Sequence, residues 1–193
     1  MQVTHRRTSG PLPAQLLDDP RLDELEAWGK RLAGLGISPA ASGNLSCRSD
    51  RGFLITATGV PLDEIQQEHW VAVTRVSPMA NGSLRIESRG LHEPSRDAGV
   101  HAAVYDRLPD AMAVFHLHPD YLDELSVGLV LPTTRDYHKA GTAESVAEIE
   151  RSIEPGTNYL VIVDHGIVTW EATVDAAGQT VERYHRAVEG LAG

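Results

Sequence analysis

The stretch Ala111-Met112-Ala113-Val114-Phe115-His116-Leu117-His118 is an apolar run that ends in two histidines. A short apolar run of this kind predicts a buried strand. Alternate side chains of a strand share one face, so His116 and His118 point the same way, about 6.6 Å apart along the chain. Phe115 and Leu117 then point into a core. The segment therefore predicts a strand that presents two imidazoles side by side.

Helical and strand-like segments lie on both sides of this strand. A helix is predicted to begin near Pro20 and to end near Gly34, because leucines and a tryptophan recur between them every three or four residues. Asn81-Gly82 predicts a hairpin turn. Strands bunch in mid-chain with helices before, between and after them, so we expect a mostly antiparallel sheet covered by helices. The further helices are expected over residues 97–108, 119–125, 143–153 and 173–191, and the strands over residues 45–48, 52–56, 70–76, 84–87, 159–163 and 167–170.

The length of 193 residues favours a single domain. Residues 1–13 are polar and contain two prolines, so we expect a flexible N-terminal arm followed by one domain over residues 14–193. The single cysteine, Cys47, rules out an intrachain disulfide and favours a reducing compartment. With no signal-peptide pattern after the first residues, we expect a cytoplasmic protein.

The net charge of −10 restricts the partners of the chain. It argues against nucleic acid or an anionic membrane surface as the main partner. No stretch approaches the roughly 18 apolar residues of a membrane helix. A phosphorylated small molecule remains compatible with an acidic protein, because one local site can still be positive.

Two imidazoles on one strand face can converge on a metal ion at about 2.0–2.1 Å. The third candidate ligand is His165, which ends an apolar strand and precedes Gly166, where the chain must turn sharply. Three histidines and a carboxylate suit zinc with room for substrate, and imidazole also binds manganese, iron, cobalt or nickel. The alternative interpretation is that His116 and His118 are surface histidines and that His165 is an ordinary turn residue.

Three short polar segments are candidates for anion binding. They are Ser42-Gly43-Asn44-Leu45-Ser46, Thr58-Gly59 and Pro94-Ser95-Arg96-Asp97. Glycine lets the backbone approach a ligand, and amides and hydroxyls at a helix start suit an anion. Ser95 has the alternative role of a helix cap, and Arg96 that of a solvated surface arginine.

The order of these motifs resembles the class II aldolase/adducin family of metal-dependent sugar-phosphate enzymes. The motifs that carry the resemblance are the three polar segments, the run Ile55-Thr56-Ala57-Thr58-Gly59-Val60-Pro61, the His-x-His and the late His165-Gly166. The resemblance runs from about Trp28 to the end of the chain. It implies a three-layer α/β/α fold with a central, mainly antiparallel sheet, and a homotetramer with sites at subunit interfaces. It also implies that His116, His118 and His165 hold a divalent metal, typically Zn²⁺, that Asp97 ligates it or acts as acid/base, and that Gly43, Asn44, Thr58, Gly59 and Ser95 cradle a phosphate.

The sequence departs from the family pattern in two informative places. The aldolases usually carry Glu where this chain has Asp97, whereas the epimerase branch has Asp. Arg96 replaces what is often a second serine, and it can pair a phosphate or a carboxylate. The remaining proton donor is expected in the loop after Pro132, at Tyr137 or at Asp136; the alternative is a loop tyrosine that only packs.

The function expected from these features is a metal-dependent lyase, an aldolase-type enzyme. It would cleave a small phosphorylated ketose by retro-aldol chemistry through a metal-stabilised enediolate. A pentulose-phosphate 4-epimerase and a sugar-acid phosphate decarboxylase or dehydratase are alternatives on the same scaffold. A non-catalytic, adducin-like scaffold is the alternative of another class, since fold does not fix function.

Overall fold

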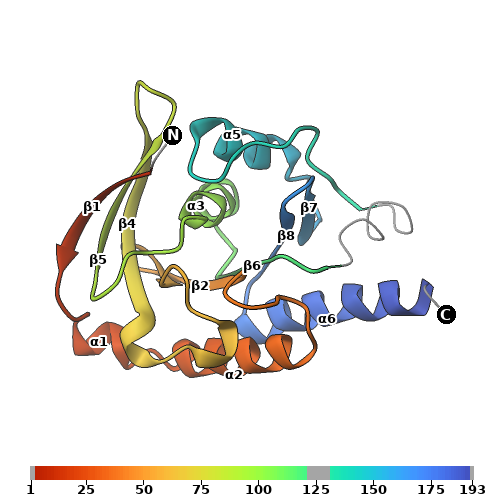
Figure 1. The fold of residues 1–193 in the computed structure, drawn as a ribbon, viewed down its shortest axis with the longest axis horizontal. Coiled ribbons are helices and arrows are strands. Elements are labelled where there is room, and N and C mark those ends of the chain that lie inside the picture. Colours follow the sequence, from red (N-terminus) through yellow and green to blue (C-terminus); the bar gives the residue numbers. More distant parts are fainter. Residues whose placement is uncertain (1–2, 121–130, 192–193) are drawn as a thin grey trace.

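The computed structural model describes residues 3–120 and 131–191. Within them the centre of the molecule is an eight-stranded sheet of order β1-β5-β4-β3-β2-β6-β8-β7 (Figure 1). Neighbouring strands pair antiparallel, apart from the parallel pair β1–β5. The strands are β1 (Thr4–Ser9), β2 (Asn44–Ser49), β3 (Gly52–Thr56), β4 (Trp70–Pro78), β5 (Leu84–Gly90), β6 (Ala113–Leu117), β7 (Tyr159–Ile162) and β8 (Gly166–Glu171).

Helices cover both faces of the sheet (Figure 1). One face carries α1 (Ala14–Leu17), α2 (Pro20–Gly34) and α6 (Val174–Leu191), and the other carries α3 (Ala98–Arg107) and α5 (Ala143–Ser152). Two short 3-10 turns, η1 (Leu62–Glu64) and η2 (Gln67–His69), precede β4. A separate apolar cluster fills each interface between helices and sheet. The three-layer α/β/α fold with a mostly antiparallel sheet is therefore confirmed.

The two core clusters divide the residues of β6 as the strand period requires. Phe115 and Leu117 lie in the cluster beneath α2 and α6, as predicted, and Val114 lies in the cluster beneath α3. His116 shares the face of Val114, is fully buried, and so points toward the α3 layer. The alternation of β6 is what turns this histidine away from the larger core.

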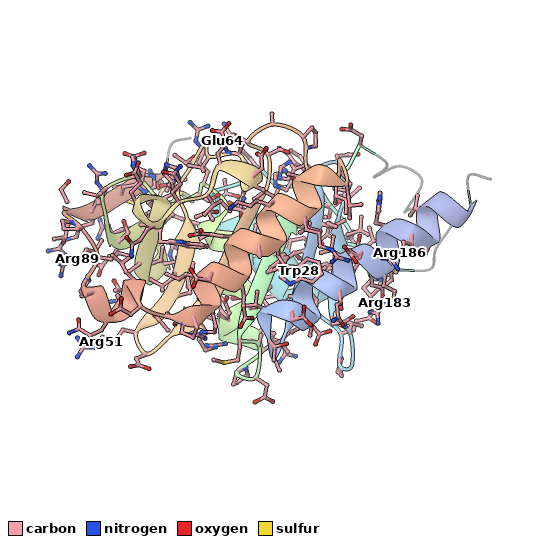
Figure 2. All side chains as sticks on the ribbon, turned by 90° about the horizontal axis from the view of Figure 1, so that it is seen from below. Trp28, Arg51, Glu64, Arg89, Arg183 and Arg186 are labelled. Atoms are coloured by element: carbon pink, nitrogen blue, oxygen red, sulfur yellow. The ribbon has the colours of Figure 1, made fainter. Side chains whose placement is uncertain are left out.

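The helix α2 begins and packs as its sequence indicates. Asp19 accepts a hydrogen bond from the Arg21 backbone amide at 3.0 Å, and Pro20 occupies the first turn. Figure 2 shows α2 beside α6 beneath the sheet, with Trp28 at their junction. A Cβ at Gly178 of α6 would lie 2.1 Å from the Trp28 ring, so glycine is what lets the two helices approach.

The expectation of a flexible arm over residues 1–13 is wrong for Thr4–Ser9, which form β1. This strand pairs in parallel with β5, from Thr4 opposite Arg85 to Ser9 opposite Gly90. An edge strand exposes much of its surface, so it needs no apolar alternation, and its polar composition disguised it. Of the helix expected over residues 119–125, Pro119 and Asp120 are not helical, and residues 121–125 lie outside the described residues.

None of the helices in residues 3–120 and 131–191 combines the length and apolar character needed to cross a bilayer.

Candidate metal centre and active site

The four predicted metal ligands converge at one end of β6. Ligand atoms of Asp97, His116, His118 and His165 all lie within 4.8 Å of one another. The Nε2 atom of His116 lies 3.0 Å from that of His118 and 3.2 Å from that of His165. An ion bound tetrahedrally at about 2.1 Å separates its ligand atoms by about 3.4 Å. The three Nε2 atoms are therefore spaced as the ligands of a single ion.

The third histidine is brought in by the pairing of β8 with β6. Leu117 lies opposite Ile167, so the loop between β7 and β8 places His165 beside the end of β6. Gly166 leaves no room for a side chain: a Cβ there would lie 2.4 Å from the Leu117 carbonyl oxygen and 3.3 Å from His116 Cε1. Glycine at this position thus permits the close approach of the two strands at the site.

Hydrogen bonding fixes which nitrogen His116 presents. Its Nδ1 donates to the Ile167 carbonyl at 2.8 Å, and a carbonyl can only accept. The lone pair of the neutral ring is therefore on Nε2, which faces the other histidines. Burial lowers the pKa of His116 to about 3 and also lowers the pKa of His118. Both rings are neutral near pH 7, the state that metal binding requires.

Asp97 completes the ligand set from the N-terminus of α3. Its Oδ2 accepts from Asn44 Nδ2 at 3.2 Å, and its Oδ1 lies 3.6 Å from His165 Nε2. Burial alone would raise the pKa of Asp97, but the contact with His165, and attraction to His116 and His165 when those rings carry a proton, hold that pKa below its usual range. Asp97 Oδ1 is buried and has no hydrogen-bond partner among the described residues. An ionised, buried oxygen without a hydrogen-bond partner, lying beside three imidazoles, fits a divalent cation.

The loop that carries Tyr137 is held beside His165. Thr134 bonds the edge of β7 through its amide, which donates to the Val161 carbonyl at 2.9 Å, and its hydroxyl accepts from the Val163 amide at 3.0 Å. The Tyr137 ring centroid lies 6.2 Å from that of His165, and the tyrosine is half exposed. The structure thus brings Tyr137 to the candidate site. Asp136 lines a small pocket that also contacts His165.

The segments predicted to bind phosphate meet near Asp97. The Ser95 amide donates to the Thr56 carbonyl at 3.1 Å, and the Thr58 amide donates to the Glu93 carbonyl at 3.0 Å. Gly59 has φ +76°, and a Cβ there would meet no atom within 4 Å. These contacts place the Thr58-Gly59 turn beside the start of α3.

Other candidates in this group have structural contacts of their own. The Ser95 hydroxyl accepts from the Asp97 amide at 3.2 Å, but the N-cap residue of α3 is Asp97, so Ser95 is not the cap that the alternative interpretation expects. Gly43 is packed tightly: a Cβ there would lie 2.7 Å from Ser38 Oγ. Arg96 is exposed. The side-chain amide of Asn44 donates one hydrogen bond to Asp97, so Asn44 connects the metal-ligand set with the predicted phosphate site.

The sequence pattern did not single out His101, which is fully buried and lies in hydrogen-bond contact with Asn44. The sequence feature that could have indicated His101 is its spacing. His101 lies four residues after Asp97 and four before Tyr105, so the three side chains share one face of α3. A polar pair on the apolar face of a helix is easily taken for ordinary core packing.

Comparisons with known proteins bear on the family and the fold of the chain. The family model described as Class II Aldolase and Adducin N-terminal domain matches residues 23–191. An L-fuculose phosphate aldolase of Escherichia coli O6:H1 is 26% identical over 163 residues, which cover 74% of this chain and 69% of that protein. The crystal structure of a sugar-phosphate aldolase from Thermotoga maritima shares the fold, with a TM-score of 0.74 and 20% identity over 89% of this chain and 93% of that one.

Two further relatives carry names of different reactions. A 3-oxo-tetronate 4-phosphate decarboxylase of Haemophilus influenzae is 26% identical, covering 80% of this chain and 79% of that protein. A methylthioribulose-1-phosphate dehydratase of Microcystis aeruginosa is also 26% identical, covering 90% of this chain and 93% of that protein. The relatives agree on a superfamily of enzymes but differ in the reaction. With the family model matching most of its length, the chain belongs to the class II aldolase and adducin N-terminal domain family.

Proposed function

We propose that this chain is a metal-dependent lyase, an aldolase-type enzyme that cleaves a small phosphorylated ketose by retro-aldol chemistry. The observation that carries the proposal is the convergence of three Nε2 atoms on a space that the unpartnered Asp97 Oδ1 also faces. The names of the relatives support a phosphorylated substrate. The proposal includes a cytoplasmic protein that assembles as a homotetramer with sites at subunit interfaces.

His116, His118 and His165 would hold the ion, with Asp97 as the fourth candidate ligand. Zn²⁺ is the first choice for this donor set, and Mn²⁺, Co²⁺, Ni²⁺ and Fe²⁺ use the same ligands. When bound, the ion would supply Lewis acidity for the negative charge left on the ketose as its carbon–carbon bond breaks. Imidazole binds a metal as a neutral ligand, so the three histidines would leave the positive charge of the ion undiminished.

Two side chains are proposed to move protons. As the alternative to ligating the ion, Asp97 Oδ1, ionised and unpartnered, can accept the proton of the substrate hydroxyl next to the breaking bond. Tyr137, whose ring lies beside that of His165, can then donate the proton of its hydroxyl to the carbon that keeps the electron pair of the broken bond. Glycines and polar groups at the start of α3 and at the two nearby turns would bind the phosphate; they are Gly43, Asn44, Thr58, Gly59, Ser95 and Arg96.

Two observations favour neighbouring reactions as alternatives. Asp97 stands where the family's epimerases also have Asp, which favours a pentulose-phosphate 4-epimerase. The dehydratase and decarboxylase relatives align over more of their length than the L-fuculose phosphate aldolase does, which favours elimination or decarboxylation. In this chain all three reactions would use the same ligand set and the same stabilised charge. A non-catalytic, adducin-like scaffold has no need of three converging histidines.

The test is condensation in the reverse direction. Zinc-loaded protein is incubated with dihydroxyacetone phosphate and a panel of small aldehydes, and products are followed by mass spectrometry. A new ketose phosphate, absent with the Asp97→Ala variant, supports the lyase. No condensation, together with epimerised or decarboxylated product from a pentulose phosphate or an oxo-acid phosphate, would replace it with an alternative. Protein that binds no metal at all would favour the scaffold.

A further inference from the structure

A chain of buried hydrogen bonds leads away from Asp97 through two elements. It runs from Asp97 to Asn44, then to His101, Ser46 and Tyr105. The heavy-atom distances from Asn44 onward are 2.6, 2.6 and 2.8 Å. Asn44 and Ser46 share one face of β2, and His101 and Tyr105 are one helical turn apart on α3, so the two pairs interdigitate.

The carboxylate fixes the direction of every link. Ionised Asp97 can only accept, so Asn44 presents its amide nitrogen to it and its amide oxygen to His101. His101 must therefore donate from Nε2. The neutral ring then accepts at Nδ1, so Ser46 donates to His101 and Tyr105 donates to Ser46. Each polar atom in the series has a partner of the right kind, which makes the network self-consistent.

The network orients Asp97 rather than carrying protons. The Asn44 carboxamide does not exchange a proton between its ends, so no proton passes from His101 to Asp97. What the chain does determine is which carboxylate oxygen is held: Oδ2 is bound by Asn44, and Oδ1 is left facing His165. A carboxylate that lost this anchor would be free to rotate.

We propose that His101 is a positioning residue for the metal centre: through Asn44 it holds Asp97 with Oδ1 turned toward the ion. This inference rests on the metal centre of the proposed function and deepens it. It assigns roles to two residues outside the ligand set, His101 and Asn44. His101 holds Asn44, and Asn44 orients Asp97 in addition to making the predicted phosphate contact.

Two amide substitutions of His101 separate positioning from simple packing. The glutamine amide nitrogen is three bonds from Cβ, as is His Nε2, and can donate to Asn44. The asparagine amide nitrogen is only two bonds from Cβ. It therefore occupies the place of His Nδ1 and cannot reach Asn44. The affinity for Zn²⁺ alone, measured by competition with a chromophoric chelator, should stay within about threefold of wild type in His101→Gln. It should fall about 10- to 100-fold in His101→Asn and His101→Leu, the usual effect of losing an outer partner of a ligand.

Controls and a metal-free readout complete the design. Thr180→Val removes a buried hydrogen-bonding hydroxyl on α6, so it should lower the melting temperature while leaving the zinc affinity unchanged. In metal-free protein labelled with ¹⁵N-histidine, long-range ¹H–¹⁵N spectra should show His101 as the Nε2–H tautomer. An Nδ1–H tautomer, or equal zinc affinities for His101→Gln and His101→Asn, would overturn the positioning role. Wild-type protein that binds zinc but turns over no sugar phosphate would instead contradict only the proposed function.

Discussion

At the scale of single residues, the site depends on three rings whose nitrogens are aimed by their surroundings. His116 is the most constrained, since it is buried, donates from Nδ1 to Ile167 and contacts both other histidines through Nε2. His92, by contrast, is exposed and belongs to a different group of possible metal ligands, with Glu68 and His69. The two histidines therefore form a matched pair for a test of the ligand assignment.

The His116→Ala variant should lose the metal and the activity together, because two remaining imidazoles and one carboxylate bind an ion far more weakly. Metal content after purification in the presence of zinc and extensive dialysis should fall from about one ion per chain to near zero. The His92→Ala variant should keep its ion. Equal metal content in the two variants would show that the ion binds elsewhere.

The close approach at Gly166 gives a second prediction. In Gly166→Ala the new Cβ would lie 2.4 Å from a backbone oxygen, so β8 must shift, and the free energy of unfolding should fall by about 1–3 kcal/mol. Gly34→Ala is the control, since a Cβ there meets nothing within 4 Å and alanine is the better helix former. Urea unfolding should show the first variant destabilised and the second unchanged or slightly stabilised. Equal unfolding midpoints would contradict the packing at Gly166.

At the scale of elements, α5 is the support for the loop that carries Tyr137. Its buried Glu148 accepts from the Arg135 amide at 2.8 Å and pairs with Arg151 at 2.6 Å. The Arg151 side chain and the Arg135 amide lower the pKa of Glu148, which keeps it ionised. The helix thus fixes the loop by a carboxylate at the point where the loop turns toward His165.

Removing that carboxylate should loosen the loop without unfolding the sheet. In Glu148→Ala the Arg135 amide loses its acceptor, so its hydrogen exchange should become about tenfold faster or more. Glu144→Ala, on the exposed face of the same helix, serves as the control. Exchange at Arg135 that is the same in both variants would mean that Glu148 does not hold the loop.

Elements with a strong period were predictable from the sequence, and contacts between distant residues were less so. The apolar spacing of α2 and the apolar run of β6 specify their elements locally, because each buries one face. β1 escaped prediction because its partner β5, not its own composition, makes it a strand. The His-x-His pattern and the turn at Gly166 indicated the three histidines as candidate ligands, and the family resemblance implied that they hold one ion. The role of Asn44 beside His101 depends on how β2 meets α3, which no local pattern encodes.

At the scale of the whole molecule, burial of neutral imidazoles makes the stability of the metal-free protein depend on pH. Burial lowers the pKa of His101 and of His116 to about 3 in the folded state. In the unfolded chain both titrate near about 6.5. Between these values the unfolded state binds more protons, so stability falls as the pH falls.

Below about pH 6, each such histidine makes the free energy of unfolding fall by about 1.4 kcal/mol for each unit by which the pH is lowered. Chemical unfolding of the metal-free protein between pH 6 and pH 4.5 should show this loss, in a range where Asp97 stays ionised in both states. The His101→Gln variant should lose one histidine's share of the slope. Stability that is flat over this range would contradict neutral burial of these rings.

The central claim is that three imidazoles and one carboxylate surround a single ion. X-ray absorption spectroscopy of the zinc-loaded protein measures this shell directly. The account predicts three imidazole nitrogens with their outer-ring scattering and at least one oxygen, at about 2.0–2.2 Å. It also predicts that this signature loses one imidazole in His165→Ala. A shell of oxygens without imidazole scattering, or one unchanged in that variant, would contradict it.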